Sequence, residues 1–235
     1  MPNFSLFDHD YHALVIGSGG AIGSAFLNAF KADPHCKHAQ GLSRSEEKGF
    51  DLLSLESILL SAQVCQKWAP YHVIIDATGA LSIEGVGPEK SLAALEAEQL
   101  QKAFQVNAIG PALVLKHFAP LMARGSVFYA KLSARVGSIS DNQKGGWYSY
   151  RASKAALNML LQTAAIELQR RNPLLQVLAL QPGTVQSKLS QPFIASVKDP
   201  LTPERSVSGM LLAMKALPSA QGAQFIDYQG QRIEW

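Results

Sequence analysis

The first glycine-rich turn limits the possible folds of this chain more than any other feature. The apolar run from Ala13 to Gly17 predicts a buried strand, and the segment Gly17 to Gly23 contains four glycines. Apolar residues from Ala25 to Phe30 then recur at helical spacing. A strand that passes through glycines directly into a helix is typical of doubly wound parallel sheets.

This turn has two interpretations. It is either a dinucleotide-binding loop, whose glycines let the backbone approach a pyrophosphate at the helix N-terminus, or a tight connection that holds no ligand. In the first case the residues of the turn that bind the cofactor are Gly17, Ser18, Gly19, Ala21, Ile22 and Gly23.

Strands and helices alternate along the rest of the chain. We expect further strands at 38–42, 71–76, 126–131, 175–180 and 222–227, and helices at 54–67, 91–98, 100–122, 148–171 and 203–216. This order predicts an α/β fold: one Rossmann domain over residues 1–235, a doubly wound parallel sheet of six or seven strands, and a short substrate lid at about 186–202. Too few residues separate Arg44 from Phe50 for a full crossover, so one βα unit should be shortened there.

Composition excludes several other classes of protein. The net charge of +3 is spread along 235 residues without a basic run, so nucleic acid is not an expected partner. The two cysteines, Cys36 and Cys65, lie in no Cys-x-x-Cys or metal-binding pattern, so neither a disulfide framework nor a bound metal is expected. The chain lacks a leader-like N-terminus and any apolar run of about 18 residues, so we expect a cytoplasmic protein without membrane contact.

The end of the strand at 38–42 bears on the choice of cofactor. Ser43 and Arg44 follow it, where a carboxylate would accept the hydroxyls of an adenosine ribose and an arginine suits a 2′-phosphate. NADP is therefore the expected cofactor and NAD the alternative. In the other interpretation, Arg44 is simply a solvated side chain of the loop.

Tyr150 and Lys154 form the strongest candidate for chemistry. Their spacing of four residues places both side chains on one face of a helix, where an ammonium would favour phenolate and lower the tyrosine pKa. Tyr148 lacks a lysine at this spacing. Ser133 follows the strand at 126–131, and ligands of open α/β sheets bind beyond the carboxyl ends of strands. The alternative is an ordinary pair of surface residues on an amphipathic helix.

Six motifs in order resemble those of the short-chain dehydrogenase/reductase family. They are Gly17 to Gly23, Ala77 to Gly79, Asn107, Ser133, the Tyr150 and Lys154 pair, and Pro182 to Thr184. The similarity spans nearly the whole chain and is greatest to the branch of C-factor and the sniffer-type carbonyl reductases. The runs SARVGSISDN, GGWYSYRASKAALN, QPGTVQSKLSQPF and IDYQGQRIEW carry this closer resemblance.

The resemblance implies hydride transfer between a nicotinamide and a carbonyl or alcohol carbon. Tyr150 would exchange the proton, Lys154 would hold the nicotinamide ribose and lower the tyrosine pKa, and Ser133 would bind the substrate oxygen. Asn107 would bend its helix and hold a water that connects Lys154 to solvent. By the same resemblance, Asp51, Leu52, Ala77, Thr78, Gly79, Pro182, Gly183, Thr184 and Val185 would join Tyr150 and Lys154 in binding the cofactor, and a homodimer or homotetramer is expected.

The chain also departs from the family pattern. Ala21 stands where the turn usually has glycine, and Asp76 to Gly79, DATG, replaces the usual NNAG. An alternative function is a signalling or nucleotide-sensing protein, similar to C-factor, that binds NAD(P) without significant turnover. A purely structural α/β domain is the third candidate, and it predicts no stabilisation by NADP(H).

Overall fold

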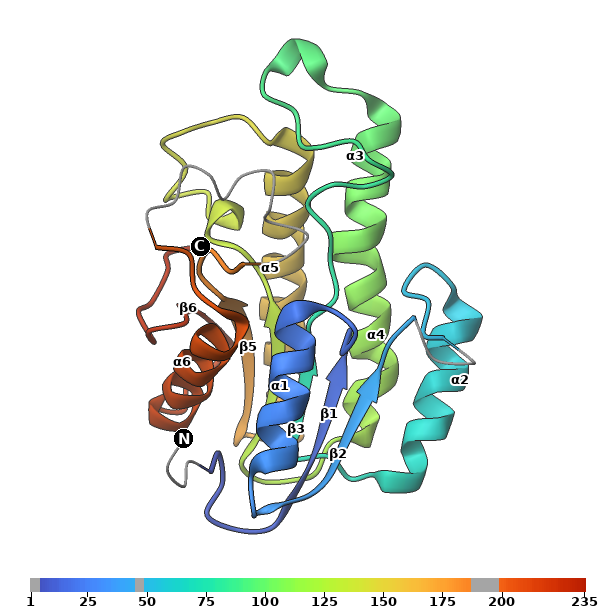
Figure 1. Ribbon diagram of the computed structural model, residues 1–235, viewed down its shortest axis with the longest axis vertical. Coiled ribbons are helices and arrows are strands. Elements are labelled where there is room, and N and C mark those ends of the chain that lie inside the picture. Colours follow the sequence, from blue (N-terminus) through green and yellow to red (C-terminus); the bar gives the residue numbers. More distant parts are fainter. Residues whose placement is uncertain (1–4, 45–48, 187–198) are drawn as a thin grey trace.

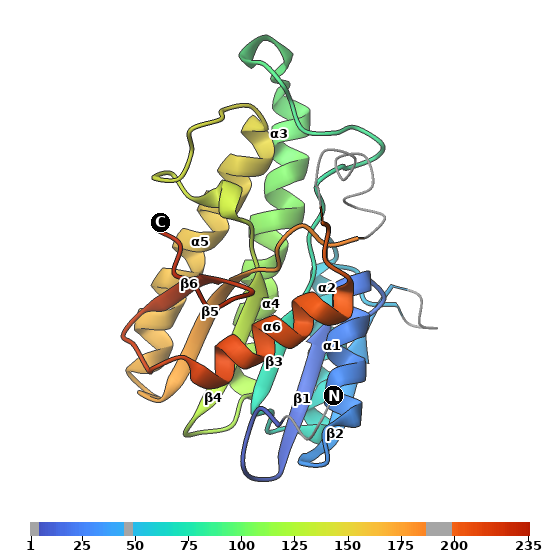
Figure 2. The same ribbon diagram turned by 60° about the vertical axis from the view of Figure 1, so that its left-hand side comes forward.

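A parallel sheet forms the centre of the molecule (Figures 1 and 2). The computed structural model describes residues 5–44, 49–186 and 199–235. Within them the sheet has six strands in the order β2-β1-β3-β4-β5-β6. The strands are β1 (Tyr11–Ile16), β2 (Cys36–Leu42), β3 (Val73–Asp76), β4 (Val127–Leu132), β5 (Leu175–Gln181) and β6 (Ala223–Asp227). The doubly wound α/β fold predicted from the sequence is confirmed, with six of the six or seven expected strands.

Helices cover both faces of this sheet. They are α1 (Ala21–Ala32), α2 (Leu55–Cys65), α3 (Ala97–Phe104), α4 (Gly110–Phe118), α5 (Tyr148–Gln169) and α6 (Pro203–Ala216). The helices α1 and α6 pack together on one face, and α2, α4 and α5 lie on the other (Figure 1). Because both faces are covered, the inner strands β3, β4 and β5 are buried almost throughout, as expected of a parallel sheet, whereas the edge strand β2 is only partly buried.

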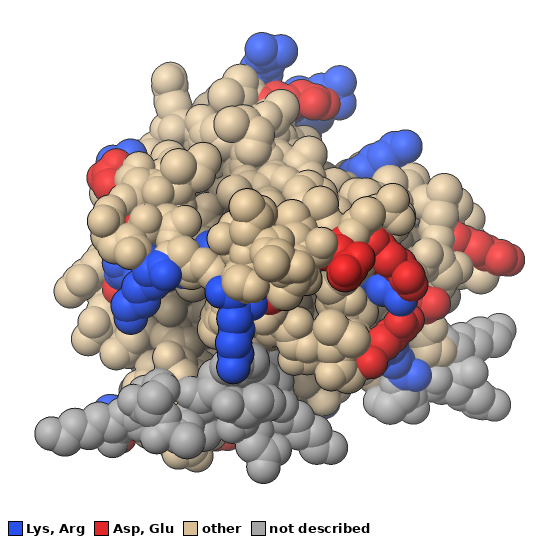
Figure 3. All heavy atoms as spheres, turned by 90° about the horizontal axis from the view of Figure 1, so that it is seen from above, with Lys and Arg blue, Asp and Glu red and all other residues tan. Residues whose placement is uncertain are grey.

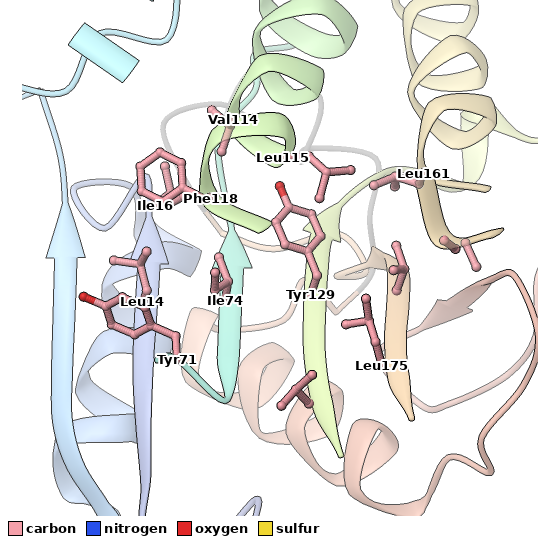
Figure 4. Close-up of a cluster of buried hydrophobic side chains, with 14 of the residues drawn as sticks. Leu14, Ile16, Tyr71, Ile74, Val114, Leu115, Phe118, Tyr129, Leu161 and Leu175 are labelled. Atoms are coloured by element: carbon pink, nitrogen blue, oxygen red, sulfur yellow. The ribbon is translucent and has the colours of Figure 1, made fainter. Parts of the chain in front are cut away.

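Two clusters of buried side chains fill the layers between sheet and helices. Alternate residues of each strand point to opposite faces, so Tyr129 enters one cluster and Phe128 the other. In Figure 4, Tyr129 lies among Leu115, Phe118 and other side chains beneath α4. Every residue of β4 is buried, including a lysine, Lys131, near its carboxyl end.

The glycine turn joins β1 to α1 through two positions that require glycine. Gly17 has a φ of 85°, and a side chain at Gly23 would collide with the backbone of Gly17. The backbone N–H groups of Gly17 and Ser18 donate to the carbonyl oxygen of Leu42, at 2.8 and 3.0 Å. The turn is thereby fixed beside the end of β2.

The connection after β2 is short, as predicted. Among the described residues, β2 is the edge strand of the sheet, and the next element is α2, which leads into β3 on the other side of β1. Ser54 caps α2, as its side chain accepts a hydrogen bond from the N–H of Ser57 at 3.2 Å. The described sheet therefore ends at β2 on this side and has no seventh strand beyond it.

One expected helix is wrong. Before α3 begins at Ala97, the range 91–98 forms only the 3₁₀ turn Leu92–Ala94, followed by extended backbone at Leu95 and Glu96. The reason is burial: Leu92 is 66% exposed, so this segment has no packed apolar face, and a short helix is unstable without one. The expected helix at 100–122 is α3 and α4, joined by a π-helical segment, Gln105–Ile109, that includes Asn107.

Other sequence predictions have mixed outcomes. Neither Cys36 nor Cys65 takes part in a disulfide within the described residues. No described helix combines the length and the apolar character needed to span a bilayer. Most of the expected lid at 186–202 lies outside the described residues; at its ends, the N–H of Gln186 donates to the carbonyl of Leu201 at 2.8 Å.

Candidate active site

The candidate residues lie at the carboxyl ends of the strands. The glycine turn follows β1, Ala77 to Gly79 follow β3, and Ser133 follows β4. Figure 3 views the molecule from this end, where separate groups of basic and acidic side chains project from a face formed mostly by other residues. Parallel strands thus bring motifs that are far apart in the sequence to one edge of the sheet.

Asn107 is fully buried and connects three elements. Its side-chain oxygen accepts from the N–H of Ala80 and its nitrogen donates to the carbonyl of Ala80, both at 2.9 Å. The same nitrogen lies 3.4 Å from the hydroxyl of Ser153 on α5. The helix has its π-helical segment at this residue, and the bend that the family resemblance implied stays a prediction. Asn107 therefore joins the segment after β3 to the helix of Tyr150 and Lys154.

Lys154 is buried beside the turn that follows β3. Its ammonium donates to the carbonyl of Leu132 at 3.2 Å and lies 5.7 Å from the centre of the Tyr150 ring. A side-chain carbon at Gly79 would come within 3.4 Å of the Lys154 nitrogen, so glycine keeps this approach open. Burial, with a smaller contribution from the positive charge of Lys131, lowers the pKa of Lys154 to about 7.

Tyr150 lies on the same face of α5 as Lys154, as the spacing predicted. It is half-buried, with its ring edge-on to Trp147 at 6.2 Å between centroids, whereas Tyr148 is exposed. The prediction of a lowered tyrosine pKa is not met in the protein alone: burial raises the pKa of Tyr150 above its usual range. The reason is that burial disfavours the negatively charged phenolate.

Ser133 makes a contact that the sequence did not predict. Its hydroxyl donates to the side-chain oxygen of Asn158 on α5 at 2.7 Å, and only 5% of the residue is exposed. The N–H of Ser133 continues the sheet by donating to the carbonyl of Leu180 at 2.8 Å. The oxygen keeps lone pairs for a further donor, and its contact with substrate stays a prediction.

The residues expected to bind the adenosine half of a cofactor surround the glycine turn. The helix α1 begins there without a side-chain cap, so its first N–H groups are free to meet an anion. Ser43 is buried at the end of β2 and Arg44 beside it is exposed. Leu52 packs where a side chain at Gly110 would lie, and Asp51 is exposed and accepts from the N–H of Leu53 at 2.9 Å.

The predicted cofactor-binding motif Pro182 to Val185 follows β5 at the same carboxyl edge of the sheet. The carbonyl of Pro182 accepts from the hydroxyl of Ser206 at 2.5 Å. Gly183 has a φ of 78°, and a side chain there would meet Leu201. The next two residues differ: Thr184 is exposed and Val185 is buried.

The sequence analysis missed two buried charged residues next to the site. Lys131 of β4 donates to the carboxylate of Asp76 at 3.0 Å, and neither side chain is exposed to solvent. The carboxylate of Glu89 accepts from both the N–H and the hydroxyl of Ser149, one residue before Tyr150, and so caps α5. A lysine inside the apolar run VFYAKL was a visible signal for the first; the second lies in an irregular loop and has no pattern.

Comparisons with known proteins agree with this geometry. The family model described as short chain dehydrogenase matches residues 49–197. The 1-hydroxy-2-glutathionyl-2-methyl-3-butene dehydrogenase of Rhodococcus sp. (strain AD45) is 28% identical over 190 residues, 80% of each chain. C-signal of Myxococcus xanthus is 35% identical over 137 residues, which are 58% of this chain and 78% of C-signal.

Solved structures show the same fold at low sequence identity. The carbonyl reductase Sniffer of Drosophila melanogaster superposes with a TM-score of 0.82 at 19% identity and covers 97% of this chain and all of its own. The NADPH-bound carbonyl reductase from chicken fatty liver gives 0.82 at 21%, with the same coverage. Fold and site thus define an oxidoreductase of the dinucleotide-binding class. The chain belongs to the short-chain dehydrogenase/reductase family of NAD(P)-dependent enzymes, close to C-signal and Sniffer.

Proposed function

We propose that this enzyme is an NADP-dependent reductase of carbonyl compounds, with Tyr150 as the general acid and base. The observation that carries the proposal is the approach of Tyr150 and the buried ammonium of Lys154, 5.7 Å from ring centre to nitrogen, beside Gly79. A nicotinamide at this edge would supply or accept the hydride. The chain's own residues then have only to orient the substrate and move one proton.

Tyr150 is suited to donate that proton in the direction of reduction. Burial keeps its phenol protonated, so the proton is available when negative charge develops on a carbonyl oxygen. Lys154, on the same helix face, stabilises the phenolate left after transfer by its positive charge. Asn107 connects Ala80 to α5 through its hydrogen bonds. We propose that the segment around Asn107 also holds a water that returns a proton to Lys154.

Ser133 is the proposed substrate-binding hydroxyl. The side-chain oxygen of Asn158 accepts a hydrogen bond from the Ser133 hydroxyl at 2.7 Å and fixes the direction of that side chain. In that orientation Ser133 would accept a hydrogen bond from an alcohol, and a rotation of the hydroxyl would let it donate to a carbonyl oxygen. Asn158 thus holds the oxygen in place for both directions of the reaction.

The cofactor set is proposed to be the one predicted from the sequence. The free N-terminus of α1 fits a pyrophosphate, and Arg44, exposed after the end of β2, fits a 2′-phosphate. NADPH bound to one of the two similar carbonyl reductase structures supports the choice of NADP. Exchange of Arg44 for aspartate should weaken NADPH binding by about tenfold to a hundredfold and leave NADH binding nearly unchanged. Equal losses for both nucleotides would overturn the 2′-phosphate assignment.

The function is tested by steady-state oxidation of NADPH and NADH with a panel of aldehydes, ketones and quinones. We expect turnover with NADPH that falls by about 10²–10⁴-fold in Tyr150→Phe and is kept in Tyr148→Phe, the matched control two residues away. Full activity of Tyr150→Phe would remove Tyr150 from the mechanism.

A signalling or nucleotide-sensing role is the second candidate, and the similarity to C-signal favours it. This role predicts tight binding of NADPH without turnover on any member of the panel.

We further propose that the whole chain, residues 1–235, is one domain with a substrate lid at about 186–202, and that it assembles as a homodimer or homotetramer through α4 and α5. A groove of about 600 Å³ runs between these helices, lined by Leu115, Leu160 and others. Met159 and Ile166 on α5 are 66% and 47% exposed. Leu160→Lys should dissociate the assembly in light scattering after gel filtration, and Leu92→Lys, at a more exposed and distant leucine, should not.

A further inference from the structure

The pair formed by Asp76 and Lys131 lies in the interior, in contact with the turn Ala77 to Gly79 that follows β3. Both side chains have no exposed surface, and their charged atoms are 3.0 Å apart. The strands β3 and β4 pair with Asp76 opposite Lys131, so the sheet itself brings the two charges together. Removing two charges from water is costly, and such a pair is weak evidence for stability alone.

Lys131 holds the backbone that the cofactor is proposed to contact. Its ammonium donates to the carbonyl of Thr78 at 2.5 Å and lies 3.1 Å from the Thr78 hydroxyl. Asp76 accepts from the N–H of Thr78 at 2.9 Å and from its hydroxyl at 2.6 Å. Thr78 is thus fixed from both sides, and the next residue, Gly79, is the one that approaches Lys154.

The charges around Lys154 are few and lie close by. Lys131 comes from β4, Asp76 from β3 and Tyr150 from α5, while the π-helical segment presents the neutral Asn107. The positive charge of Lys131 disfavours the charged form of Lys154, and Asp76 favours it to a smaller extent. Among the described residues, the side-chain carboxylate of Asp76 accepts hydrogen bonds from Lys131 and Thr78 through one oxygen, and its second oxygen has no hydrogen-bond partner.

We propose that Lys131, paired with Asp76, is a positioning residue that sets the charge of Lys154 and fixes Thr78 and Gly79 against it. Lys131 does not contact the reacting atoms. It acts through Lys154, whose charged form stabilises the phenolate of Tyr150. This inference rests on the proposed role of Lys154 in catalysis.

The first test is the pH dependence of kcat/KM for carbonyl reduction, which reports groups of the free enzyme. Because the pKa of Lys154 is about 7, the wild-type rate should fall above that pH. In Lys131→Met this limb should move up by about one pH unit, because the repelling charge is gone. In Lys131→Arg, which keeps the charge, the limb should stay in place. An unmoved limb in Lys131→Met would overturn the proposal, since a structural role would change only the rate.

A second measurement does not depend on turnover. Titration of 13C-lysine-labelled protein by NMR follows Lys154 directly, with its signal assigned by its absence in Lys154→Met. An upward shift is again expected in Lys131→Met. A smaller upward shift is expected in the double variant Asp76→Asn/Lys131→Met, which also loses the favourable effect of Asp76 and leaves no unpaired charge if the single variant does not fold. A shift without turnover would refute the reductase function alone, and turnover without a shift would refute the role of Lys131 alone.

Discussion

The two ends of the sheet hold buried polar groups in different ways. At the amino end, the Asp33 carboxylate accepts from the hydroxyls of Tyr11 and Ser5, at 2.7 and 2.8 Å, and from the N–H of His35 at 2.9 Å. At the carboxyl end, two ammonium groups, those of Lys131 and Lys154, are buried; Lys131 pairs with the buried carboxylate of Asp76 at 3.0 Å, whereas Lys154 donates to the carbonyl of Leu132.

The difference separates structural from functional burial. Around Asp33, uncharged donors satisfy both carboxylate oxygens. These hydrogen bonds connect the segment before β1 to the end of α1. Around Lys154, burial and a like charge lower the pKa to about 7, so that the ammonium is only partly charged at neutral pH. Groups shifted this far are concentrated at functional sites. We therefore expect substitutions at the two ends to change different properties.

The largest effect is expected from Lys154→Met. Loss of the ammonium should lower kcat/KM by about 10²–10⁴-fold, because the Tyr150 phenolate is no longer stabilised. The free energy of unfolding should be unchanged or higher, since an apolar side chain replaces a buried charge. Lys31→Met, at an exposed lysine near the end of α1, serves as the control in both assays. A large loss of stability in Lys154→Met would contradict the comparison.

Tyr11→Phe should have the opposite profile. It removes one hydrogen bond to Asp33 and should lower the free energy of unfolding in urea by about 1–2 kcal/mol. The value of kcat/KM should stay within about twofold of wild type, because the reacting groups lie at the other end of the sheet. A tenfold loss of activity at unchanged stability would show that the two ends are coupled.

The smallest effect concerns acid stability and His72. Burial, followed by the neighbouring His9 and His12, lowers the pKa of His72, whose ring nitrogen accepts from the N–H of His12 at 3.2 Å. As the pH falls, the unfolded chain therefore binds a proton at a higher pH than the folded protein does. The contribution of neutral His72 to stability is complete above about pH 6.5 and is lost as the pH falls below that value. His72→Asn keeps an acceptor without a titrating group and should reduce the fall in Tm between pH 7 and 5 by about 1–2 °C. An equal fall in both proteins would exclude His72.

The sequence predicted the order of elements and the place of the site, because both depend on local patterns. Apolar runs marked the strands, and the spacing of Tyr150 and Lys154 marked one helix face. It did not predict the raised pKa of Tyr150 or the contact of Ser133 with Asn158, since both depend on packing between distant segments. Lys131 was visible as a charge in an apolar run, but its partner depends on strand pairing. The expected helix at 91–98 failed because propensity does not report burial.

Thermal unfolding with and without NADPH tests the central claim most directly, because only the carboxyl end should respond to nucleotide. At a hundredfold excess over Kd, NADPH should stabilise the wild type by about 2.7 kcal/mol, a rise in Tm of several degrees. Tyr11→Phe should begin from a lower Tm and show the same rise. An unchanged Tm of the wild type at saturating NADPH would contradict the assignment of this end of the sheet to the cofactor and its chemistry.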